Sequence, residues 1–458
     1  MWRDDLRSLR ENKLLTKHPL LVIIIIGLAA RLLLMPLLQV GFDSDYWATI
    51  IRNMQSGAGL YELEGYYYTP VWGYVLGGLA PLQEMFSGID VMGEKIVEAL
   101  GVESFLDRQY ASMLTTPAFN FMAKIPMLIC DILVGYLIYW IIKDKTGNVK
   151  KATWGFALWF LCPMIITITS VSSMFDNFSV LFTLLCIIAI RKDQMFLGGA
   201  LFTVAVLTKF FPAYLIFILI AYIWSRHRDD GKALKYTLFA AVGAIAMFLI
   251  LMWPQILDGT FMESFSFITN RAGGGGGEVS ILGTIISMGA VFTYFVAILV
   301  SMVLAVVLYK SREKDKDKLL FGFSMAVIAI VFLYPPAPQY LVLLMAFLIC
   351  YMALYDRKYK GSWWLLSIGA TLFVIGGGNA VLLLSTAAFT DLLSMESLMS
   401  AITMFQDPLL FGVSSMELIC GIAGVIQYIG ILSIIWRFFK DKMGPKKIRE
   451  PDPNQFSD

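Results

Sequence analysis

Long apolar runs alternate with short polar segments along most of the chain. A membrane-spanning helix needs about 20 predominantly apolar residues, and this pattern predicts about twelve of them. They are expected near residues 19–40, 117–142, 151–170, 174–190, 195–208, 210–225, 236–254, 279–309, 319–335, 338–355, 362–385 and 411–436. The short runs 195–208 and 210–225 are expected to be broken or tilted, which is tolerated where protein or a water-filled cavity satisfies the backbone.

The composition agrees with this pattern. The 458 residues are 58% hydrophobic and 15% charged, against about 25% charged residues in soluble domains. We therefore expect an all-α, polytopic membrane protein. The net charge of +2 predicts no nucleic-acid partner. All five cysteines fall inside apolar segments, so the sequence predicts no disulfide framework.

Lysine and arginine are concentrated in alternate loops, and the positive-inside rule then predicts that both termini are cytoplasmic. Residues 70–86 are apolar, but a crossing there would place the basic loop 143–151 outside. We therefore expect an external loop at 41–116 with helices at 70–86 and 90–112 lying on or dipping into the bilayer. The predicted division is 1–18 as a cytoplasmic segment, 19–225 as a first membrane half, 226–436 as a more variable half and 437–458 as a cytoplasmic tail.

Two acids, Asp43 and Asp45, directly follow the first apolar run. In an extended loop, a spacing of two would point them to opposite sides, so at most one is expected to reach a given reacting atom. The functional interpretation is that one is a general base and the other positions a substrate or an ion. The alternative is a pair of solvated loop acids.

Lys124 and Asp131 are seven residues apart in the second span, so they share a helix face. Ionisable groups at that depth are costly and usually line a cavity or pair with each other. The sequence leaves open a role for Lys124 in binding a carrier phosphate and a purely structural ion pair.

Asp176 and Lys209 lie at junctions between expected spans on the external side. Asp176 is interpreted either as a ligand for sugar hydroxyls or as a helix N-cap. Lys209 interrupts an apolar run and needs an anion or a carboxylate. It is interpreted as a contact to the phosphate of a lipid carrier, or as a side chain that reaches up to the membrane interface.

Two other external positions carry candidate groups. Arg271 stands beside the run Gly273–Gly277. It is interpreted either as a ligand for a phosphate or diphosphate or as an ordinary loop arginine. Gln339 lies in a Pro-rich turn and could hydrogen-bond a sugar or phosphate, or merely belong to a tight hairpin. The two histidines, His18 and His227, map to the cytoplasmic side, and no Walker A pattern is present. External histidine chemistry and an ATP-driven pump are therefore not expected.

A series of short motifs then follows in order along the first 225 residues. They are Asp43-Ser44-Asp45-Tyr46, Tyr66-Tyr67-Tyr68-Thr69-Pro70, Cys130-Asp131-Ile132-Leu133, Ser172-Ser173-Met174-Phe175-Asp176-Asn177 and Lys209-Phe210-Phe211-Pro212. The series resembles the catalytic subunit of GPI mannosyltransferase I. More loosely, it resembles other polyprenyl-phosphate-sugar-dependent enzymes of the GT-C superfamily.

The resemblance implies an inverting glycosyltransferase with a GT-C-like fold. Its donor would be a dolichyl- or polyprenyl-phosphate hexose, usually mannose, and its acceptor a lipid-linked or other glycan on the non-cytoplasmic side. Asp45 or Asp43 would be the base, with Lys209, Arg271 and Lys124 at the carrier phosphate. The sugar or acceptor would contact Tyr68, Asp131, Asp176, Asn177 and Gln339. The chain departs from the family at Cys162-Pro163, where the family has Asn-Pro.

No metal or other cofactor is required by this chemistry, although Asp43 and Asp45 could together bind a divalent cation. An accessory membrane subunit is also left open. The membrane would be the cell membrane in a prokaryote and the endoplasmic reticulum in a eukaryote. Rival interpretations are a lipid or solute transporter, a flippase and a lipid-glycan ligase. A transporter would favour polar groups near the bilayer midplane between inverted repeats, whereas the groups here gather toward one surface.

Overall fold

The computed structural model describes residues 18–62, 66, 68–85, 114–265, 281–334, 337–410 and 412–443. The first half contains α3 Pro19–Leu37, α4 Gly41–Gln55, α5 Pro70–Met85, α8 Pro117–Thr146, α9 Val149–Phe160, α10 Pro163–Ile166, the π-helix η1 Thr167–Val171, α11 Asp176–Arg191, α12 Met195–Thr208, the 3₁₀ helix η2 Phe211–Leu215 and α13 Ile216–Arg226.

The second half begins with α14 Ala233–Leu257, η3 Glu263–Phe265, α16 Ile281–Lys310, α17 Lys316–Val331, η4 Pro338–Tyr340, α18 Leu341–Leu354 and η5 Arg357–Tyr359. It continues with α19 Lys360–Gly378, η6 Asn379–Leu383, α20 Leu384–Phe389, α21 Met395–Gln406 and α22 Ser415–Met443. Strands β1 Pro408–Leu410 and β2 Val413–Ser414 form a short antiparallel hairpin. The all-α fold class is confirmed.

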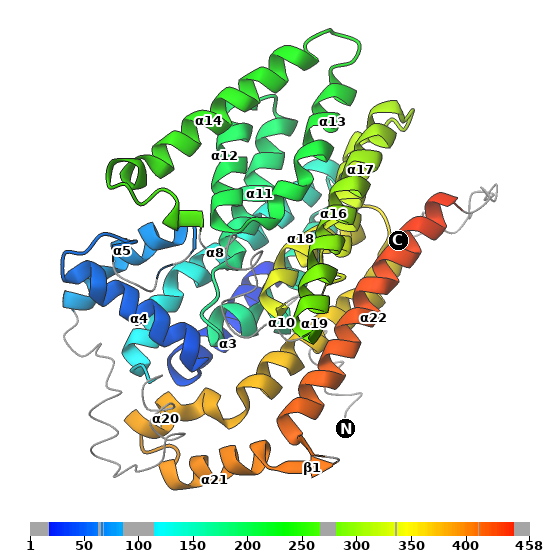
Figure 1. The fold of residues 1–458 in the computed structure, drawn as a ribbon. Helices are drawn as coiled ribbons and strands as arrows, with labels where there is room; N and C mark the ends of the chain where they lie inside the picture. The colour runs from blue at the N-terminus through cyan, green and yellow to red at the C-terminus, as the bar shows by residue number, and fades with distance from the viewer. Residues whose placement is uncertain are drawn as a thin grey trace.

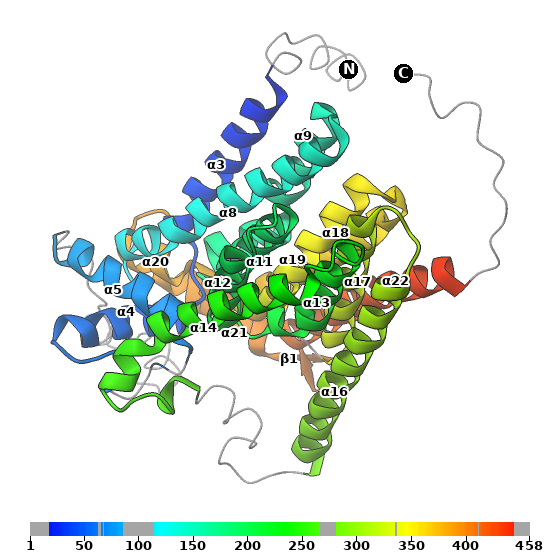
Figure 2. The ribbon, with the colours of Figure 1, turned by 90° about the horizontal axis from the view of Figure 1, so that it is seen from above.

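The helices form a bundle with additional elements at two of its edges. Helices α4 and α5 pack at one side and α22 lies at the opposite side in both views (Figures 1 and 2). Helices α20 and α21 and the hairpin form a layer at one end (Figure 1). Helix α18 is buried from Leu341 to Ala353, as expected for a helix that is hydrophobic on all sides. By contrast, α14, α16 and α22 expose large apolar side chains such as Phe239, Phe292 and Trp436, which suits contact with lipid.

Among the described residues, six helices are long and apolar enough to cross a membrane, or up to seven if the bent pair Val149–Phe160 and Pro163–Val171 counts as one span. Each of the twelve predicted spans coincides with a helix or with consecutive short helices. Several of them, such as α12 with 14 residues and α17 with 16, are shorter than a bilayer-length helix. The membrane character of the bundle is confirmed, while the number of crossings and the sidedness of the termini stay predictions.

Residues 41–55 form a helix rather than the extended loop that the sequence suggested. The sequence predicts helices within the external loop 41–116 only at 70–86 and 90–112. In the structure, α4 buries Trp47, Ala48, Ile50 and Ile51 on one face, and this tertiary packing stabilises the helix. The helix predicted at 70–86 is present as α5, and the helix predicted at 90–112 lies outside the described residues.

A buried ion pair joins the first two long helices. The Arg31 side chain of α3 donates from Nε to Oδ2 of Asp131 in α8 over 3.1 Å, and both side chains are fully buried. The Arg31 Nη1 donates to the carbonyl oxygens of Gly27 and Phe160 at 3.2 and 2.7 Å. The guanidinium also lies 4.2 Å from the centre of the Phe160 ring. Arg31 therefore connects α3 to both α8 and α9.

The other polar contacts of Asp131 reach two further elements. Thr169 of the π-helix η1 donates to Oδ2 at 2.8 Å, and Asn177 of α11 donates to Oδ1 at 2.9 Å. Asn177 also donates to the carbonyl of Met127 at 2.8 Å. Because burying a charge is costly unless it is paired and hydrogen-bonded, this network fixes the positions of α3, α8, η1 and α11 relative to one another.

The ion pair yields a stability prediction. Replacing Arg31 with methionine leaves the Asp131 carboxylate buried without its cation, and breaking such a pair typically costs about 3–5 kcal/mol. We expect Arg31→Met to lower the thermal unfolding temperature of the detergent-solubilised protein well below that of the exposed control Arg312→Met. Equal unfolding temperatures for the two variants would contradict a structural role for the pair.

Candidate active site

Lys209 stands at a break in the helical bundle. It ends α12 with an extended backbone, at φ −149° and ψ 136°, and Pro212 follows in η2. Because Pro212 has no backbone donor and its ring would clash with the carbonyl of Thr208 four residues earlier, the α12 helix does not continue into α13. The break explains why two short apolar runs stand where one long span would otherwise fit, and it places the Lys209 side chain inside the protein.

The Lys209 amino group lies beside a carboxylate. Its Nζ is 3.6 Å from Oδ2 of Asp176, and each side chain is only 5% exposed. Asp176 is the first residue of α11, and the N-cap position belongs to Phe175. The N-cap interpretation of Asp176 is therefore wrong, although a carboxylate in the first turn still interacts favourably with the positive end of the helix dipole.

Three aromatic rings surround the same amino group. The Lys209 Nζ lies 4.5 Å from the ring centre of Phe175, 4.6 Å from that of Tyr68 and 5.4 Å from that of Tyr340. A cation near the face of an aromatic ring is stabilised by the ring quadrupole, by about 2 kcal/mol or more when desolvated. This arrangement lets a positive charge persist in a site that is largely shielded from water.

Asp43 lies within electrostatic reach of this pair. The pKa of Asp43 is raised to about 7, chiefly by burial. The negative charge of Asp176 also raises this pKa, and the positive charge of Lys209 partly offsets the rise. Two contacts hold the adjoining turn of α4 in place. The hydroxyls of Ser44 and Ser173 are 3.2 Å apart, and Trp47 Nε1 donates to the Ser173 carbonyl at 3.0 Å. Asp43, Asp176 and Lys209, together with Tyr68, therefore form one cluster, which we call the Lys209 cluster.

Asp45 belongs to another environment. On a helix, residues two apart point about 200° away from each other, so Asp45 and Asp43 diverge as predicted, although through helical and not extended geometry. The pKa of Asp45 is raised to about 6 by burial, and this value includes the lowering effect of the Arg52 charge two turns further along α4. The two acids are thus distinguished by their neighbours, and only Asp43 is coupled to Lys209.

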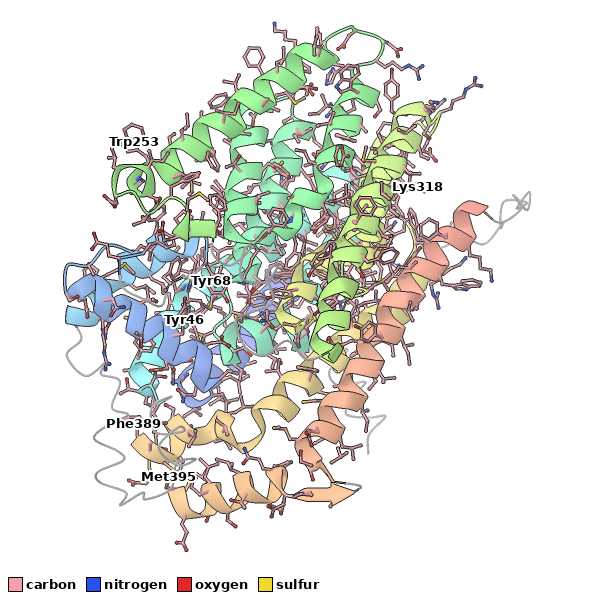
Figure 3. All side chains as sticks on the ribbon, in the orientation of Figure 1. Tyr46, Tyr68, Trp253, Lys318, Phe389 and Met395 are labelled. Carbon is pink, nitrogen blue, oxygen red and sulfur yellow. The ribbon has the colours of Figure 1, made fainter. Side chains whose placement is uncertain are left out.

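The segment that carries Tyr68 is fixed by its own hydrogen bonds. Tyr61 donates to the carbonyl of Tyr68 at 2.6 Å, and Tyr66 donates to that of Thr69 at 2.9 Å. The Thr69 hydroxyl donates to the carbonyl of Leu207 near the end of α12. Tyr68 lies beside Tyr46 of α4, with ring centres 6.4 Å apart (Figure 3). The aromatic segment therefore joins α4 to the Lys209 break.

An apolar groove begins at Lys209. A cavity of about 280 Å³ lies between α12 and α14, with Tyr68 and Lys209 at one end. A further cavity of about 130 Å³ shares the lining residues Phe202, Ile216 and Ala244 with it and reaches Thr237 near the start of α14. We call the two together the α12–α14 groove. It is lined almost entirely by apolar side chains and has one buried cation near its end.

A close approach of two backbones fixes the width of this groove. A Cβ atom added at Gly199 of α12 would lie 1.8 Å from the carbonyl oxygen of Ala240 in α14, and one added at Gly243 would lie 2.0 Å from that of Phe196. Only glycine permits this contact, because any side chain would force the helices apart. The separation of α12 and α14 beside the groove is therefore determined by these two residues.

Other predicted site residues have different roles in the structure. The Lys124 Nζ donates to the carbonyls of Met35 and Leu38 at 3.0 and 2.5 Å, so it neutralises the C-terminal end of α3. The predicted pairing of Lys124 with Asp131 is wrong, because Asp131 pairs with Arg31. Both oxygens of Asp131 are engaged in that buried network, as is the amide of Asn177. Their predicted contact with sugar gains no support from this geometry.

The two remaining candidates differ in what the structure describes. Gln339 is half-buried in η4 and directly precedes Tyr340, whose ring faces Lys209, so it lies near the Lys209 cluster. Arg271 lies outside the described residues, and its contact with a phosphate stays a prediction. In the described part of the chain, no group of three or more His, Cys, Asp or Glu side chains could hold a metal ion.

Sequence reasoning missed several residues of this site. Arg31 is the only charged residue in the run 19–40, and such an isolated charge could have indicated a buried partner. Ser173 adopts a left-handed backbone conformation with φ 57°, which no local pattern predicts. The rings of Phe175 and Tyr340 come from segments more than 160 residues apart, so their meeting at Lys209 is purely tertiary.

Comparison with known proteins gives one match. The family model described as the ALG6, ALG8 glycosyltransferase family matches residues 93–270. The matched segment contains Asp176 and Lys209, whereas Asp43, Asp45 and Tyr68 precede it. Searches of curated proteins and of solved structures found no match.

The match and the all-α membrane bundle support a membrane glycosyltransferase of the GT-C type, an enzyme class that takes its sugar from a lipid carrier and passes it to a glycan acceptor. The resemblance seen in the sequence motifs is thus supported at the level of the superfamily. The match does not single out GPI mannosyltransferase I, and it does not determine the sugar.

The electrostatic coupling within the cluster can be measured without any assumption about function. Carbodiimides modify protonated carboxyl groups, so labelling of Asp43 should fall as the pH rises through about 7. In Lys209→Met the lowering effect of the cation on the pKa of Asp43 is lost, and the labelling midpoint should move to higher pH. Lys209→Arg retains the charge and should largely preserve the midpoint.

Asp45 provides an internal control in the same peptide. Its labelling midpoint should lie at about pH 6 and should stay unchanged in Lys209→Met, because its charged neighbour is Arg52. Mass spectrometry of the labelled peptide measures both sites. If Lys209→Met leaves the Asp43 midpoint in place, the two groups are not coupled.

Proposed function

We propose that the protein is an inverting hexosyltransferase that moves a sugar from a dolichyl- or polyprenyl-phosphate carrier to a lipid-linked or glycan acceptor, with Asp43 as the general base. The observation that carries the proposal is the position of Lys209, which lines the end of an apolar groove and lies within electrostatic reach of Asp43. A carboxylate, a cation and a lipid-compatible groove at one place are the three features that the reaction needs.

The chemistry requires little from the protein. Asp43 takes the proton of an acceptor hydroxyl while the hydroxyl oxygen attacks the anomeric carbon of the donor sugar. A new carbon–oxygen bond forms, the bond to the carrier phosphate breaks, and the phosphate leaves with its carrier. A base with a pKa close to the working pH combines a useful ionised fraction with useful basicity, and the pKa of about 7 for Asp43 meets this condition.

Lys209 is suited to the departing phosphate. In the structure its charge is balanced by Asp176 at 3.6 Å, a separation longer than a strong charge-assisted hydrogen bond. A phosphate entering along the α12–α14 groove would bring oxygen acceptors to the same amino group. The aromatic rings of Tyr68, Phe175 and Tyr340 limit the access of water there, and this strengthens the attraction between the cation and the developing negative charge.

The α12–α14 groove fits the isoprenoid tail of the carrier. Its two cavities are lined almost entirely by apolar side chains, so a hydrocarbon chain can enter them without leaving buried polar groups unpaired. The identity of the sugar is a narrower question. The sequence motifs resemble a mannosyltransferase, whereas members of the matched family are typically glucosyltransferases. Mannose remains our proposal for the sugar, and a GPI intermediate is one acceptor to test.

The first test compares the two acids by conservative substitution. Asp43→Asn should lower kcat by at least about 100-fold, the usual contribution of a general base, while Asp45→Asn should retain most of the activity. Transfer is measured with radiolabelled polyprenyl-phosphate mannose and polyprenyl-phosphate glucose as alternative donors. Full turnover by Asp43→Asn would refute the assignment of Asp43 as the base. If the unaltered protein transfers sugar from the glucose donor alone, the transferred sugar is glucose and not mannose.

The second test narrows the groove. Ala244→Phe should fill part of the α12–α14 groove and raise the KM for a long-chain donor about tenfold, with little effect on a short-chain donor such as citronellyl-phosphate mannose. The matched control is Val242→Phe, since Val242 is 57% exposed on the same helix and does not line the groove. An unchanged preference for chain length in Ala244→Phe would place the isoprenoid tail elsewhere.

A further inference from the structure

A third cavity, of about 510 Å³, lies between α4, α5 and the end of α14. Its walls include Met54 and Gln55 from α4, Tyr74 and Gly77 from α5, Pro254 from α14 and Asp258, which caps the end of α14. The volume falls within the range of small-molecule sites. We call this cavity the α5 pocket, and no role has been given to it above.

The charge of the α5 pocket restricts its ligand. Asp258 is the only formally charged side chain among the lining residues, and none of them is lysine or arginine. Anionic groups such as phosphates are recognised by cations or by clustered backbone donors, so the pocket is a poor site for the phosphate of a lipid carrier. A neutral ligand rich in hydroxyl groups suits it better, because a carboxylate accepts hydrogen bonds from two hydroxyls at once.

The remaining walls suit the same ligand. Gln55 is held by a hydrogen bond of 3.0 Å from its Nε2 to the carbonyl of Ala80. Tyr74 donates to the carbonyl of Leu251 and to Oε1 of Gln255, at 2.5 and 3.1 Å. These contacts fix two polar side chains at the edge of the pocket. Between them lie apolar surfaces that include Met54 and Pro254, which match the carbon–hydrogen faces of a pyranose ring.

The α5 pocket lies at the opposite end of α4 from the Lys209 cluster. Asp43 is in the first turn of the helix, and Gln55 is its last residue. At 1.5 Å per residue, twelve residues separate them by about 18 Å. A ligand in the pocket is therefore too far from Asp43 to react there, but a chain of linked sugars could extend from one to the other along α4.

We propose that the α5 pocket binds neutral hexose units of an oligosaccharide acceptor, several sugars away from the hydroxyl that reacts. This inference rests on the proposed function, because only a glycosyltransferase would use the bound oligosaccharide as its acceptor. Binding of the oligosaccharide can nevertheless be measured without turnover. The pocket would let the enzyme select acceptors by glycan structure remote from the reacting sugar. Such remote contacts supply binding energy that can position the reacting hydroxyl.

Two adjacent glycines allow a matched test. A Cβ at Gly77 would lie 3.5 Å from Met54 Sδ, an ordinary contact, and one at Gly78 would have no heavy atom within 4 Å. Gly77 lines the pocket and Gly78 does not. Gly77→Phe should therefore fill the pocket, while Gly78→Phe imposes the same change of residue on the exposed face of the same helix.

The purified full chain is applied to an array of neutral and phosphorylated oligosaccharides. We expect binding to neutral hexose oligosaccharides, at least tenfold weaker binding by Gly77→Phe, and unchanged binding by Gly78→Phe. Asp258→Ala serves as a second variant if Gly77→Phe does not fold, with the exposed Asp391→Ala as its control. Equal binding by the pocket variant and its control, a preference for phosphorylated glycans, or no binding to any glycan would overturn the inference.

The array also separates this inference from the proposed function. Asp43→Asn should still show oligosaccharide binding that Gly77→Phe weakens, because Asp43 lies outside the pocket. Pocket-dependent binding without sugar transfer from either donor would overturn the transferase and leave a neutral-glycan site. Sugar transfer that depends on Asp43, with glycan binding unaffected by Gly77→Phe, would overturn the pocket alone.

Discussion

The buried pair between Arg31 and Asp131 is the interaction on which the rest of the structure depends. Two charges removed from water are costly, and their mutual attraction offsets that cost only when further hydrogen bonds satisfy them. Here Asp131 also accepts hydrogen bonds from Thr169 and Asn177, and Arg31 also donates to main-chain carbonyls. Apolar contacts between helices in a lipid-like environment discriminate weakly between registers. A single polar network with one satisfactory arrangement selects a register, and this one selects it for α3, α8, α9, η1 and α11.

The network determines the geometry of the candidate active site through one pair of neighbouring residues. Asn177 is held by Asp131, and Asp176 immediately before it reaches Lys209. Because successive side chains on a helix point about 100° apart, anchoring one of them sets the direction of the other. A rotation of α11 that broke the Asn177 contact would also move Asp176 away from Lys209. The interior ion pair and the site near the helix ends are thus parts of one mechanical arrangement.

The sequence predicted the features that depend on local composition. The helices, their approximate bounds and the need of Lys209 for an anionic neighbour all follow from apolar runs and from a charge inside one of them. The sequence did not predict partners. Lys124 and Asp131 share a helix face, yet each binds α3 instead of the other, because the spacing of two residues on one helix says nothing about the helix that packs against it. The helix at Asp43 was missed for a similar reason, since the burial of Trp47 and Ile51 that stabilises it is tertiary.

Helix α5 contacts α14 between two of the cavities. Tyr74 joins α5 to the end of α14, and this contact lies between the apolar α12–α14 groove and the polar α5 pocket, since α14 contributes Phe248 to the first and Pro254 to the second. Under the proposed function, a lipid and a glycan would therefore have separate binding surfaces on either side of one helix contact. Thr69 accepts a hydrogen bond from the Tyr66 hydroxyl and donates one to the carbonyl of Leu207, two residues before Lys209. On that proposal, two substrates of opposite polarity occupy the protein together without competing, and both would meet charged side chains at the Lys209 cluster.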